Sequence, residues 1–375
     1  MLRTFHPIGQ GAFYTEKHSG FNVVYDCGSM PLTNYSKSVV EAAFSKEDDI
    51  DALFISHFDY DHVSAISTLV KSVKSIKTVV LPLLDEEERN LLVNINRLLS
   101  LQQLSLLNNP RQLFGPDTRI IYIRPGNVFD DNAQTEQIVN LNDRSPKDLV
   151  KEELESRVTL SFGNQNSWVF VPYNFKHTLR QRQLLQKLGN AGFDIDKLRN
   201  DPSHTLNQIT SRNQRRQLRQ IYSQIDGNVN ENSMLVYSGP STGCQTVPFL
   251  CILGVYCSYG CKNGVCPSER PGCIYTGDTD LTKLSLIEVY NEFKPYVGTV
   301  QLPHHGSKHS FSSSSLTGFK NRLLVPISYG SKNQYGHPAA EVLNILADAG
   351  NFPLFINQTP SSKVEHSIFG VVLNE

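Results

Sequence analysis

The chain of 375 residues lacks any run of apolar residues long enough to cross a membrane. A membrane-spanning helix needs about 18 or more consecutive apolar residues. The longest candidate, residues 246–257, is shorter and contains Pro248. The start of the chain also lacks the basic segment and apolar run of a secretory leader. We therefore expect a cytoplasmic protein.

The chain also lacks a marked excess of charge of either sign, with a formal net charge of -1. Its hydrophobic residues (39%) and charged residues (19%) are in ordinary globular proportion, so a sizeable core can be buried. Neither an internal repeat nor a long low-complexity segment is present. These features predict a single domain over residues 1–375 that carries insertions.

Charge is nevertheless distributed unevenly along the chain. Residues 176–222 contain ten Lys and Arg but only three acidic residues, a balance of +7 that leaves -8 for the remainder. We predict that these residues belong to a partly helical insertion over residues 85–227. A basic surface favours a polyanionic partner, although solvated amphipathic helices without any partner would carry the same charges.

The sequence has no pair of cysteines at the C-x-x-C spacing of many zinc sites. Six of its seven cysteines still lie between Cys244 and Cys273, in and beside a predicted Cys-rich hairpin insertion at residues 240–272. A structural zinc site, disulfides and free thiols are the three alternatives, and the cytoplasm disfavours disulfides. The candidate zinc ligands are Cys257, Cys261, Cys266 and Cys273.

Runs of apolar residues predict an α/β fold. Residues 52–56 and 77–82 read as buried strands, and residues 63–73 between them have helical spacing. Strand, helix and strand in succession indicate layered α/β architecture. The remaining clear elements are strands at 21–25, 168–173, 234–237, 273–276, 298–303 and 323–328, and helical segments at 85–110 and 339–349.

Four candidate metal ligands follow the predicted strand at 52–56, namely His57, Asp59, Asp61 and His62. Two imidazoles and two carboxylates within six residues are costly at the end of a buried strand unless something positive binds them. Imidazole nitrogen and carboxylate oxygen are suitable ligands for Zn²⁺, Mn²⁺ or iron. The motif therefore predicts a site for one or two divalent ions.

Further candidates follow three later elements. Asp278 closes a predicted strand and could bridge two metals, although Gly-Asp after a strand is also a common turn. His304 and His305 stand at a strand end before a glycine, as metal ligands often do. His337 precedes a predicted helix, where it could act as a ligand, a proton donor or simply the start of the helix.

In this order, the motifs resemble the metallo-β-lactamase superfamily, whose usual metal motif is H-x-H-x-D-H. Asp59 replaces the middle histidine and gives H-x-D-x-D-H. With His304-His305-Gly306-Ser307 and Tyr335-Gly336-His337-Pro338, this variant resembles the soluble hydrolase domain of the ComEC family of DNA-uptake proteins. The resemblance covers residues 5–84 and 228–375. It implies a four-layer αβ/βα sandwich with metals at one edge.

The resemblance also implies roles for particular residues. It assigns His57 and Asp59 to one metal, and Asp61 and His62 to the other. Asp278 becomes the bridging carboxylate. A further ligand comes from the pair His304 and His305. The supporting residue that orients the motif loop is Asp26.

One ligand of the superfamily pattern has two candidates in this chain. His177 follows the predicted strand at 168–173, and Asn232 lies close to the strand at 234–237. The extra carboxylate of Asp59 adds a hard oxygen ligand to the site. This shifts the metal preference modestly from Zn²⁺ towards Mn²⁺.

These implications lead to a metal-dependent hydrolase, with a phosphodiesterase or nuclease acting on nucleic acid or nucleotides as the leading hypothesis. The candidate catalytic residues are Asp61, His305 and His337, and the candidate substrate-binding residues are Arg212, Arg215, Arg216 and Arg219. A hydrolase of carboxylic esters, lactones or amides is the alternative enzyme. A regulatory or binding module without catalysis is the alternative outside enzymes.

Overall fold

The structure is a computed structural model of the whole chain. The residues described are 1–99, 101–126, 138–143, 152–163, 167–176, 178–204, 212–223, 232–242, 249–254, 270–320 and 322–370.

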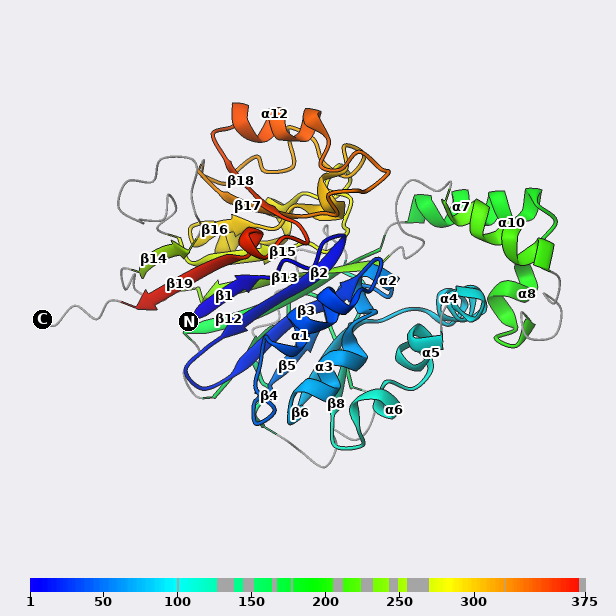
Figure 1. Cartoon of the computed structure of the whole chain (residues 1–375), viewed down its shortest axis with the longest axis horizontal. Helices are drawn as coiled ribbons and strands as arrows, with labels where there is room; N and C mark the ends of the chain where they lie inside the picture. The colour runs from blue at the N-terminus through cyan, green and yellow to red at the C-terminus, as the bar shows by residue number, and fades with distance from the viewer. Residues whose placement is uncertain are drawn as a thin grey trace, which may run out of the picture.

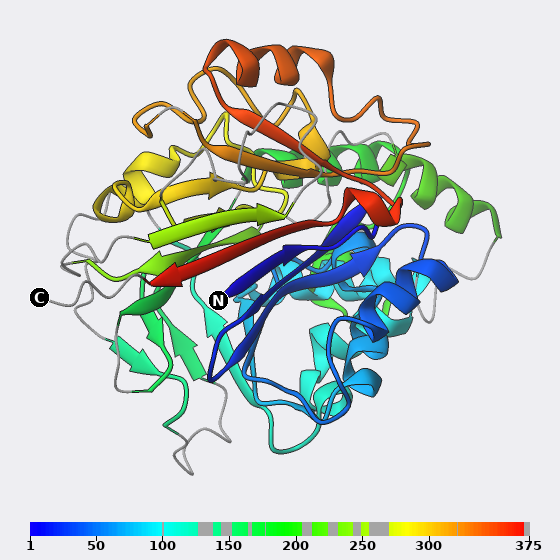
Figure 2. The same cartoon turned by 60° about the vertical axis from the view of Figure 1, so that its left-hand side comes forward.

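Two large β-sheets form the centre of the molecule (Figures 1 and 2). In the described residues, the first sheet contains, in spatial order, β10 (Glu152–Leu154), β8 (Arg119–Ile123), β7 (Thr78–Pro82), β5 (Ala52–Phe54), β3 (Asn22–Ser29), β2 (Gly11–Lys17), β1 (Leu2–Phe5), β19 (Val364–Gly370) and β14 (Phe249–Gly254). The second contains β18 (Phe352–Ile356), β17 (Leu324–Ser328), β16 (Val297–Val300), β15 (Gly272–Tyr275), β13 (Asn232–Pro240), β12 (Trp168–Lys176), β11 (Thr159–Ser161) and β9 (Ile138–Asn140). The short strands β4 (Asp49–Ile50) and β6 (Ser75–Ile76) pair separately.

Helices cover the outer face of each sheet (Figure 1). The helices α1 (Asn34–Glu41) and α3 (Ile66–Ser72) lie on the first sheet. The helices α11 (Leu286–Val289) and α12 (Ala340–Asp348) pack on the second. The layers therefore run helix, sheet, sheet, helix, which confirms the expected αβ/βα sandwich.

Alternation along the central strands explains how both faces of each sheet are buried. Successive residues of a strand point to opposite faces. Leu53 and Val79 face the helices, whereas their neighbours Phe54 and Val80 face the second sheet. All four are at most 1% exposed, so these strands read in the sequence as continuous apolar runs.

The direction of the strands brings the chemically active loops to one edge. The strands β3, β5, β7 and β8 are parallel, as are β15, β16 and β17. Loops at the carboxyl ends of parallel strands meet at a common edge of the sheet. His57 follows β5, Asp278 follows β15 and His304 follows β16.

A buried ion pair joins the two sheets away from that edge. Arg3 Nε lies 2.8 Å from Glu16 Oε1, and both side chains are almost fully enclosed. Glu16 also accepts hydrogen bonds from Tyr275 (2.8 Å) and Ser238 (2.7 Å) on the second sheet. The Arg3 guanidinium donates to Pro271 O at 2.9 Å. Each buried charge thus has the partners that offset its desolvation.

The segment 85–227 is partly helical, as expected, but its strands belong to the sandwich. The helices are α4 (Glu86–Leu99), α5 (Leu101–Asn108), α6 (Pro110–Phe114), α7 (Thr178–Asn190), α8 (Ile195–Asn200) and α10 (Arg212–Ser223). Between them, β8 enters the first sheet and β12 pairs with β13 along its whole length. Figure 1 shows α7, α8 and α10 standing away from the sandwich, and we call these three helices the basic arm.

The Cys-rich segment 240–272 is described only in part. Its strand β14 pairs with β19 at the border of the first sheet. Cys257, Cys261 and Cys266 lie outside the described residues. Cys273 is a free thiol buried between the sheets, where burial raises its pKa to about 12. In the described part of the chain, no helix has the length and apolar character needed to span a membrane.

Candidate metal centre

The motif His57 to His62 forms the loop and short helix that follow β5. Asp59 is the N-cap residue of α2 (Tyr60–Val63), but its side chain makes no capping hydrogen bond. Asp61 and His62 lie within α2 and are buried. His57 is 1% exposed. The strand end and the helix start therefore present His57, Asp61 and His62 to one enclosed space, with Asp59 at its border.

A close backbone approach fixes α2 against the first sheet. A Cβ atom at Gly28 would lie 2.5 Å from His62 C and Val63 N, so only glycine allows β3 to pass there. Ala65 N donates to Cys27 O at 2.9 Å, and Ser29 N donates to Ser64 Oγ at the same distance. The sequence signal for this contact is Asp26-Cys27-Gly28.

Asp26 positions the two histidines of this motif, His62 directly and His57 through Ser56. It has a left-handed backbone (φ 54°) and is fully buried. Its Oδ1 accepts from Ser56 N at 2.7 Å, and its Oδ2 accepts from Ser56 Oγ at 2.6 Å. Oδ2 also lies 2.8 Å from His62 Nδ1. These contacts place Asp26 directly behind Ser56 and His62, on the side away from the other candidate ligands.

The same contacts set the tautomers of the first two histidines. Ser56 Oγ donates to Asp26, so it accepts from His57 Nδ1–H across 2.8 Å. His62 Nδ1–H likewise donates to Asp26. Both imidazoles therefore direct Nε2 towards the enclosed space, as a metal-binding histidine does. Burial lowers the pKa of His57 to about 3, which keeps this ring neutral.

Asp278 faces these two nitrogens from the second sheet. Its Oδ1 lies 3.3 Å from His62 Nε2, and its Oδ2 lies 3.8 Å from His57 Nε2. Asp278 N donates to Ser233 Oγ at 3.1 Å. The preceding Gly277 has φ 55°, and a Cβ there would lie 2.6 Å from Ser233 Oγ. This tight turn delivers the carboxylate to the centre of the site.

His305 completes the opposite side. His304 and His305 both have left-handed φ (50° and 55°) within η3 (Pro303–Gly306). His305 Nδ1–H donates to Ser328 O at 2.8 Å, and its Nε2 lies 3.1 Å from Asp61 Oδ2. Although burial opposes it, the hydrogen bond with His305 lowers the pKa of Asp61 to about 2. Asp61 is therefore ionised at neutral pH.

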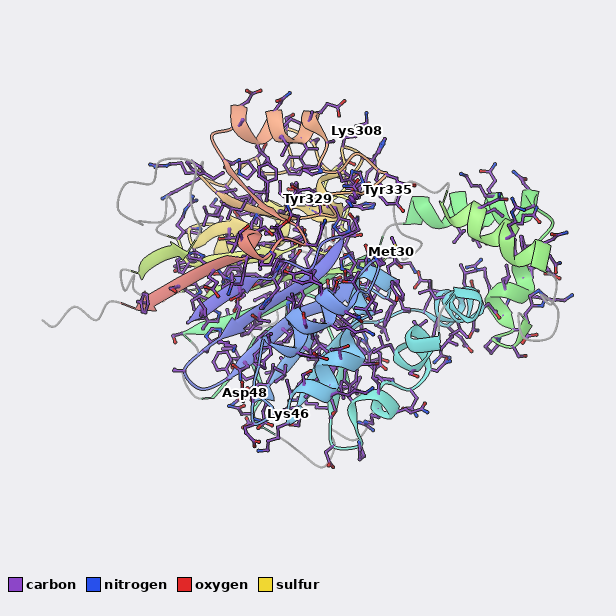
Figure 3. All side chains as sticks on the ribbon, in the orientation of Figure 1. Met30, Lys46, Asp48, Lys308, Tyr329 and Tyr335 are labelled. Carbon is purple, nitrogen blue, oxygen red and sulfur yellow. The ribbon has the colours of Figure 1, made fainter. Side chains whose placement is uncertain are left out.

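Three remaining candidates lie at the border of this cluster. Asp59 Oδ2 is 3.8 Å from His57 Nε2 and is partly exposed. His304 places its Nδ1 3.2 Å from Ser310 Oγ, and its ring centroid is 6.0 Å from that of His337. Burial lowers the pKa of His337 to about 4, and the exposed Tyr335 stacks on its ring at 5.9 Å. Figure 3 shows Tyr335 on the side of the sandwich that faces the basic arm.

Two groups of ligand atoms converge within 4.8 Å in the described part of the chain. One consists of His57, His62 and Asp278, and the other of Asp61, His62 and His305. His62 thus belongs to both groups, whereas the resemblance assigned it to one. His62 Nε2 is buried without a hydrogen-bond partner among the described residues, although it faces Asp278. A divalent cation fits this atom and this set of nitrogen and oxygen donors.

The remaining predicted residues lie elsewhere or outside the described residues. His177 is outside them. Asn232 begins β13, opposite Lys176 of β12, and only its backbone is described. Arg212, Arg215, Arg216 and Arg219 lie in α10 of the basic arm, and Arg216 is exposed.

Apart from Asp26, the residues that orient the candidate ligands were not predicted from the sequence. Ser56 links Asp26 to His57, and Ser233 holds the backbone of Asp278. Gln301 Oε1 accepts from Thr276 N at 2.8 Å and from Gly277 N at 3.0 Å, which fixes the turn before Asp278. Ser56 directly precedes His57, so its position in the sequence was the one available signal.

Comparison with known proteins agrees with this architecture. Residues 12–139 match the family model described as the metallo-beta-lactamase superfamily. With the two packed sheets and their outer helices, this match identifies the fold as the metallo-β-lactamase sandwich. No curated protein matches the sequence.

Two solved structures are similar at low identity. The short form of human tRNase Z has 10% identity and a TM-score of 0.39, with 87% of this chain and 91% of that chain covered. The metallo-beta-lactamase fold protein YhfI from Bacillus subtilis has 9% identity and a TM-score of 0.38, with 98% and 99% covered.

Proposed function

We propose that the protein is a metal-dependent hydrolase that cleaves phosphodiester bonds in nucleic acid or nucleotides. The observation that carries this proposal is the arrangement of His57, His62 and His305. Each ring donates through Nδ1 and directs Nε2 towards a carboxylate, Asp278 or Asp61. Such buried and oriented imidazoles beside ionised carboxylates suit one or two divalent ions, Zn²⁺ or Mn²⁺.

Metal bound here would supply an activated water at neutral pH and polarise the scissile phosphoryl group. The chain's own side chains would accept a proton from the water, donate a hydrogen bond to the leaving group and orient the ligands. Asp61, which is ionised and lies beside His305, would accept the proton of the attacking water. His337 lies on the open side of the site and, being neutral, would donate a hydrogen bond to the leaving oxygen. Asp26 and Ser56 would keep the ligand rings in orientation.

The basic arm supports the choice of a polyanionic substrate. Residues 176–222 carry a balance of +7, and the arm stands away from the sandwich with exposed cations such as Arg216. Arg212, Arg215, Arg216 and Arg219 follow the spacing of one helix face. A stripe of this kind attracts phosphates along a strand. The ComEC-like motif H-x-D-x-D-H favours the same substrate class.

The first experiment is a screen of metal-stripped protein, resupplied with Mn²⁺ or Zn²⁺, against single-stranded and duplex DNA, RNA and cyclic nucleotides. We expect cleavage of at least one of these substrates, and its loss in His57→Ala. Intact substrates in every combination would contradict the proposal. Turnover of esters, lactones or amides instead would favour the alternative enzyme.

The basic arm is tested separately by the salt dependence of nucleic-acid binding. Changing Arg212, Arg215, Arg216 and Arg219 to glutamine should lower the slope of log K against log salt by about 3, if each contacts one phosphate. The matched control changes four exposed lysines of the sandwich, Lys37, Lys46, Lys71 and Lys294. An equal change of slope in both proteins would contradict a role for the arm.

A further inference from the structure

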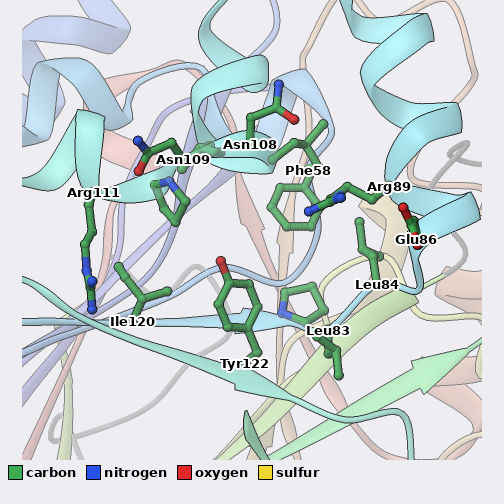
Figure 4. A pocket seen from close by; sticks show the side chains of 14 residues that line it. Phe58, Leu83, Leu84, Glu86, Arg89, Asn108, Asn109, Arg111, Ile120 and Tyr122 are labelled. Atoms are coloured by element: carbon green, nitrogen blue, oxygen red, sulfur yellow. The ribbon is translucent and has the colours of Figure 1, made fainter. Parts of the chain in front are cut away.

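A cavity of about 510 Å³ lies beside the metal loop, between the helices α4, α5 and α6 and the strands β7 and β8 (Figure 4). Its volume is within the range of about 300–1,000 Å³ typical of ligand pockets. It lies next to the loop that follows β5 and next to the end of β7, at the edge where the candidate metal centre lies.

Phe58 connects the cavity to the metal centre. It stands between His57 and Asp59 in the motif, and side chains of neighbouring residues in an extended segment point to opposite sides. His57 and Asp59 face the cluster of metal ligands, whereas Phe58 lines the cavity. A ligand in the cavity would therefore contact the same loop that presents the candidate metal ligands.

Cations from two different helices border the cavity. Figure 4 shows Arg89 of α4 and Arg111 of α6 on opposite sides, with Tyr122 of β8 between them. Burial raises the pKa of Tyr122, and both guanidiniums oppose that shift, which is consistent with their closeness to the phenol. Glu86 is the one carboxylate in the lining, so two positive charges stand against one negative charge.

Arg89 in particular is available to a ligand. It is exposed, and among the described residues it has no ion-pair partner within 4.0 Å. The neighbouring acids of α4 pair elsewhere: Glu88 with Lys176, and Glu87 with Arg199. An anionic group in the cavity would therefore gain a cation that no described side chain neutralises.

The lining combines an apolar floor with amides at the mouth. Phe58, Leu107 and Ile120 are at most 7% exposed and form the apolar part of the lining. Asn108 and Asn109 are exposed at the rim, where an amide offers both donors and an acceptor. A planar heterocycle with polar edges and an attached anion matches this lining better than an aliphatic or cationic ligand.

We propose that this cavity binds a nucleoside monophosphate unit of the substrate, with the base against the apolar side chains of the lining and the phosphate at Arg89. The inference rests on the proposed function, because it assigns the cavity to a nucleotide near the bond that is cleaved. It extends that function by placing recognition of one nucleotide outside the metal centre.

The test is calorimetric titration of the full chain in EDTA with AMP, GMP, CMP and UMP. We expect binding of at least one of them without metal. Arg89→Gln removes one charge-assisted hydrogen bond and should weaken that binding about tenfold. Asn108→Trp, at an exposed position of the rim, should block it. Arg322→Gln, an exposed arginine preceding β17, is the matched control and should bind as the wild type does.

Three results would overturn the inference: no binding of any monophosphate at millimolar concentration, equal binding of the unphosphorylated nucleoside, or binding that neither variant weakens. A short single-stranded oligonucleotide should displace the monophosphate, and failure to do so would exclude a nucleotide within a chain. Asp278→Asn separates the two proposals, because it should abolish cleavage and leave binding in EDTA unchanged. Binding without any cleavage would instead contradict the proposed function alone.

Discussion

At the scale of single residues, Asp26 connects the backbone of the motif to its ligands. One buried carboxylate accepts from Ser56 N, Ser56 Oγ and His62 Nδ1. The chain thereby determines which nitrogen each ring offers before any ligand arrives. Groups that orient metal-binding histidines in this way typically contribute about 10–100-fold to affinity.

We predict that Asp26→Asn weakens Mn²⁺ or Zn²⁺ binding about 10–100-fold. The amide of asparagine cannot accept from both Ser56 and His62 as the carboxylate does, so the rings lose their fixed orientation. Competition with a metal-chelating dye measures the affinity. Asp117→Asn, at an exposed position, is the control and should leave it unchanged. Equal affinity in all three proteins would show that Asp26 has no orienting role.

A second residue-scale prediction concerns His6, which is buried against Phe13 and hydrogen-bonded to Thr15 Oγ1 at 2.9 Å. Burial lowers the pKa of His6 from 6.5 to about 3, so below pH 6.5 the unfolded chain takes up a proton that the folded chain does not. Stability is therefore fully present above pH 6.5 and falls as the pH drops towards 3.

When the pH falls from 7 to 5, the unfolding free energy should decrease by about 2 kcal/mol more in the wild type than in His6→Gln. Urea unfolding at both pH values measures the difference. His309→Gln, at an exposed position, serves as the control and should lose as much as the wild type. Parallel losses in wild type and His6→Gln would mean that His6 is not buried in its neutral form.

The candidate metal ligands could be predicted from the sequence more readily than the residues that position them. His57, Asp61, His62, Asp278 and His305 stand beside strand ends, where buried polar groups need a reason, and the structure brings them together. Supporting contacts such as that of Ser233 depend on pairing between distant strands. No local pattern reports such pairing, so these groups could not be predicted.

At the scale of elements, the bounds of the central strands and of the helix α12 agree with those predicted from the apolar pattern. The predicted strand at 323–328 is β17 (Leu324–Ser328), and the predicted helix at 339–349 is α12 (Ala340–Asp348). The predicted helix at 63–73 corresponds to α3 (Ile66–Ser72), whereas Val63 ends α2, and Ser64 and Ala65 separate the two helices. Periodicity could not reveal this break, because it arises from the contacts of Ala65 and Ser64 with β3.

The crossing of β3 and α2 gives a prediction at this scale. Gly28→Ala places a Cβ 2.5 Å from the backbone of α2, so the helix that carries Asp61 and His62 must shift. We expect a loss of about 1–3 kcal/mol of unfolding free energy, together with weaker metal binding. Gly20→Ala is the matched control, since nothing lies within 4 Å of its Cβ. Equal stability of the two variants would contradict the close approach.

At the scale of the whole molecule, the candidate centre exists only where the two sheets meet. The first sheet and α2 supply His57, Asp61 and His62, and the second sheet supplies Asp278 and His305. Closure of the sandwich therefore assembles the ligands. The cavity at Phe58 lies beside this edge, and Figure 1 shows the basic arm on the same side of the sandwich as α2.

We propose that this assembled centre hydrolyses phosphodiesters with a bound metal. The most direct test of this proposal is the initial rate of cleavage of a phosphodiester substrate by metal-stripped protein as Mn²⁺ is added. We expect a rate that rises with Mn²⁺, saturates, and falls by about 10³-fold or more in Asp278→Asn, as when a preorganised charge is lost from a site. A rate that does not depend on metal, or that is the same in Asp278→Asn, would contradict it.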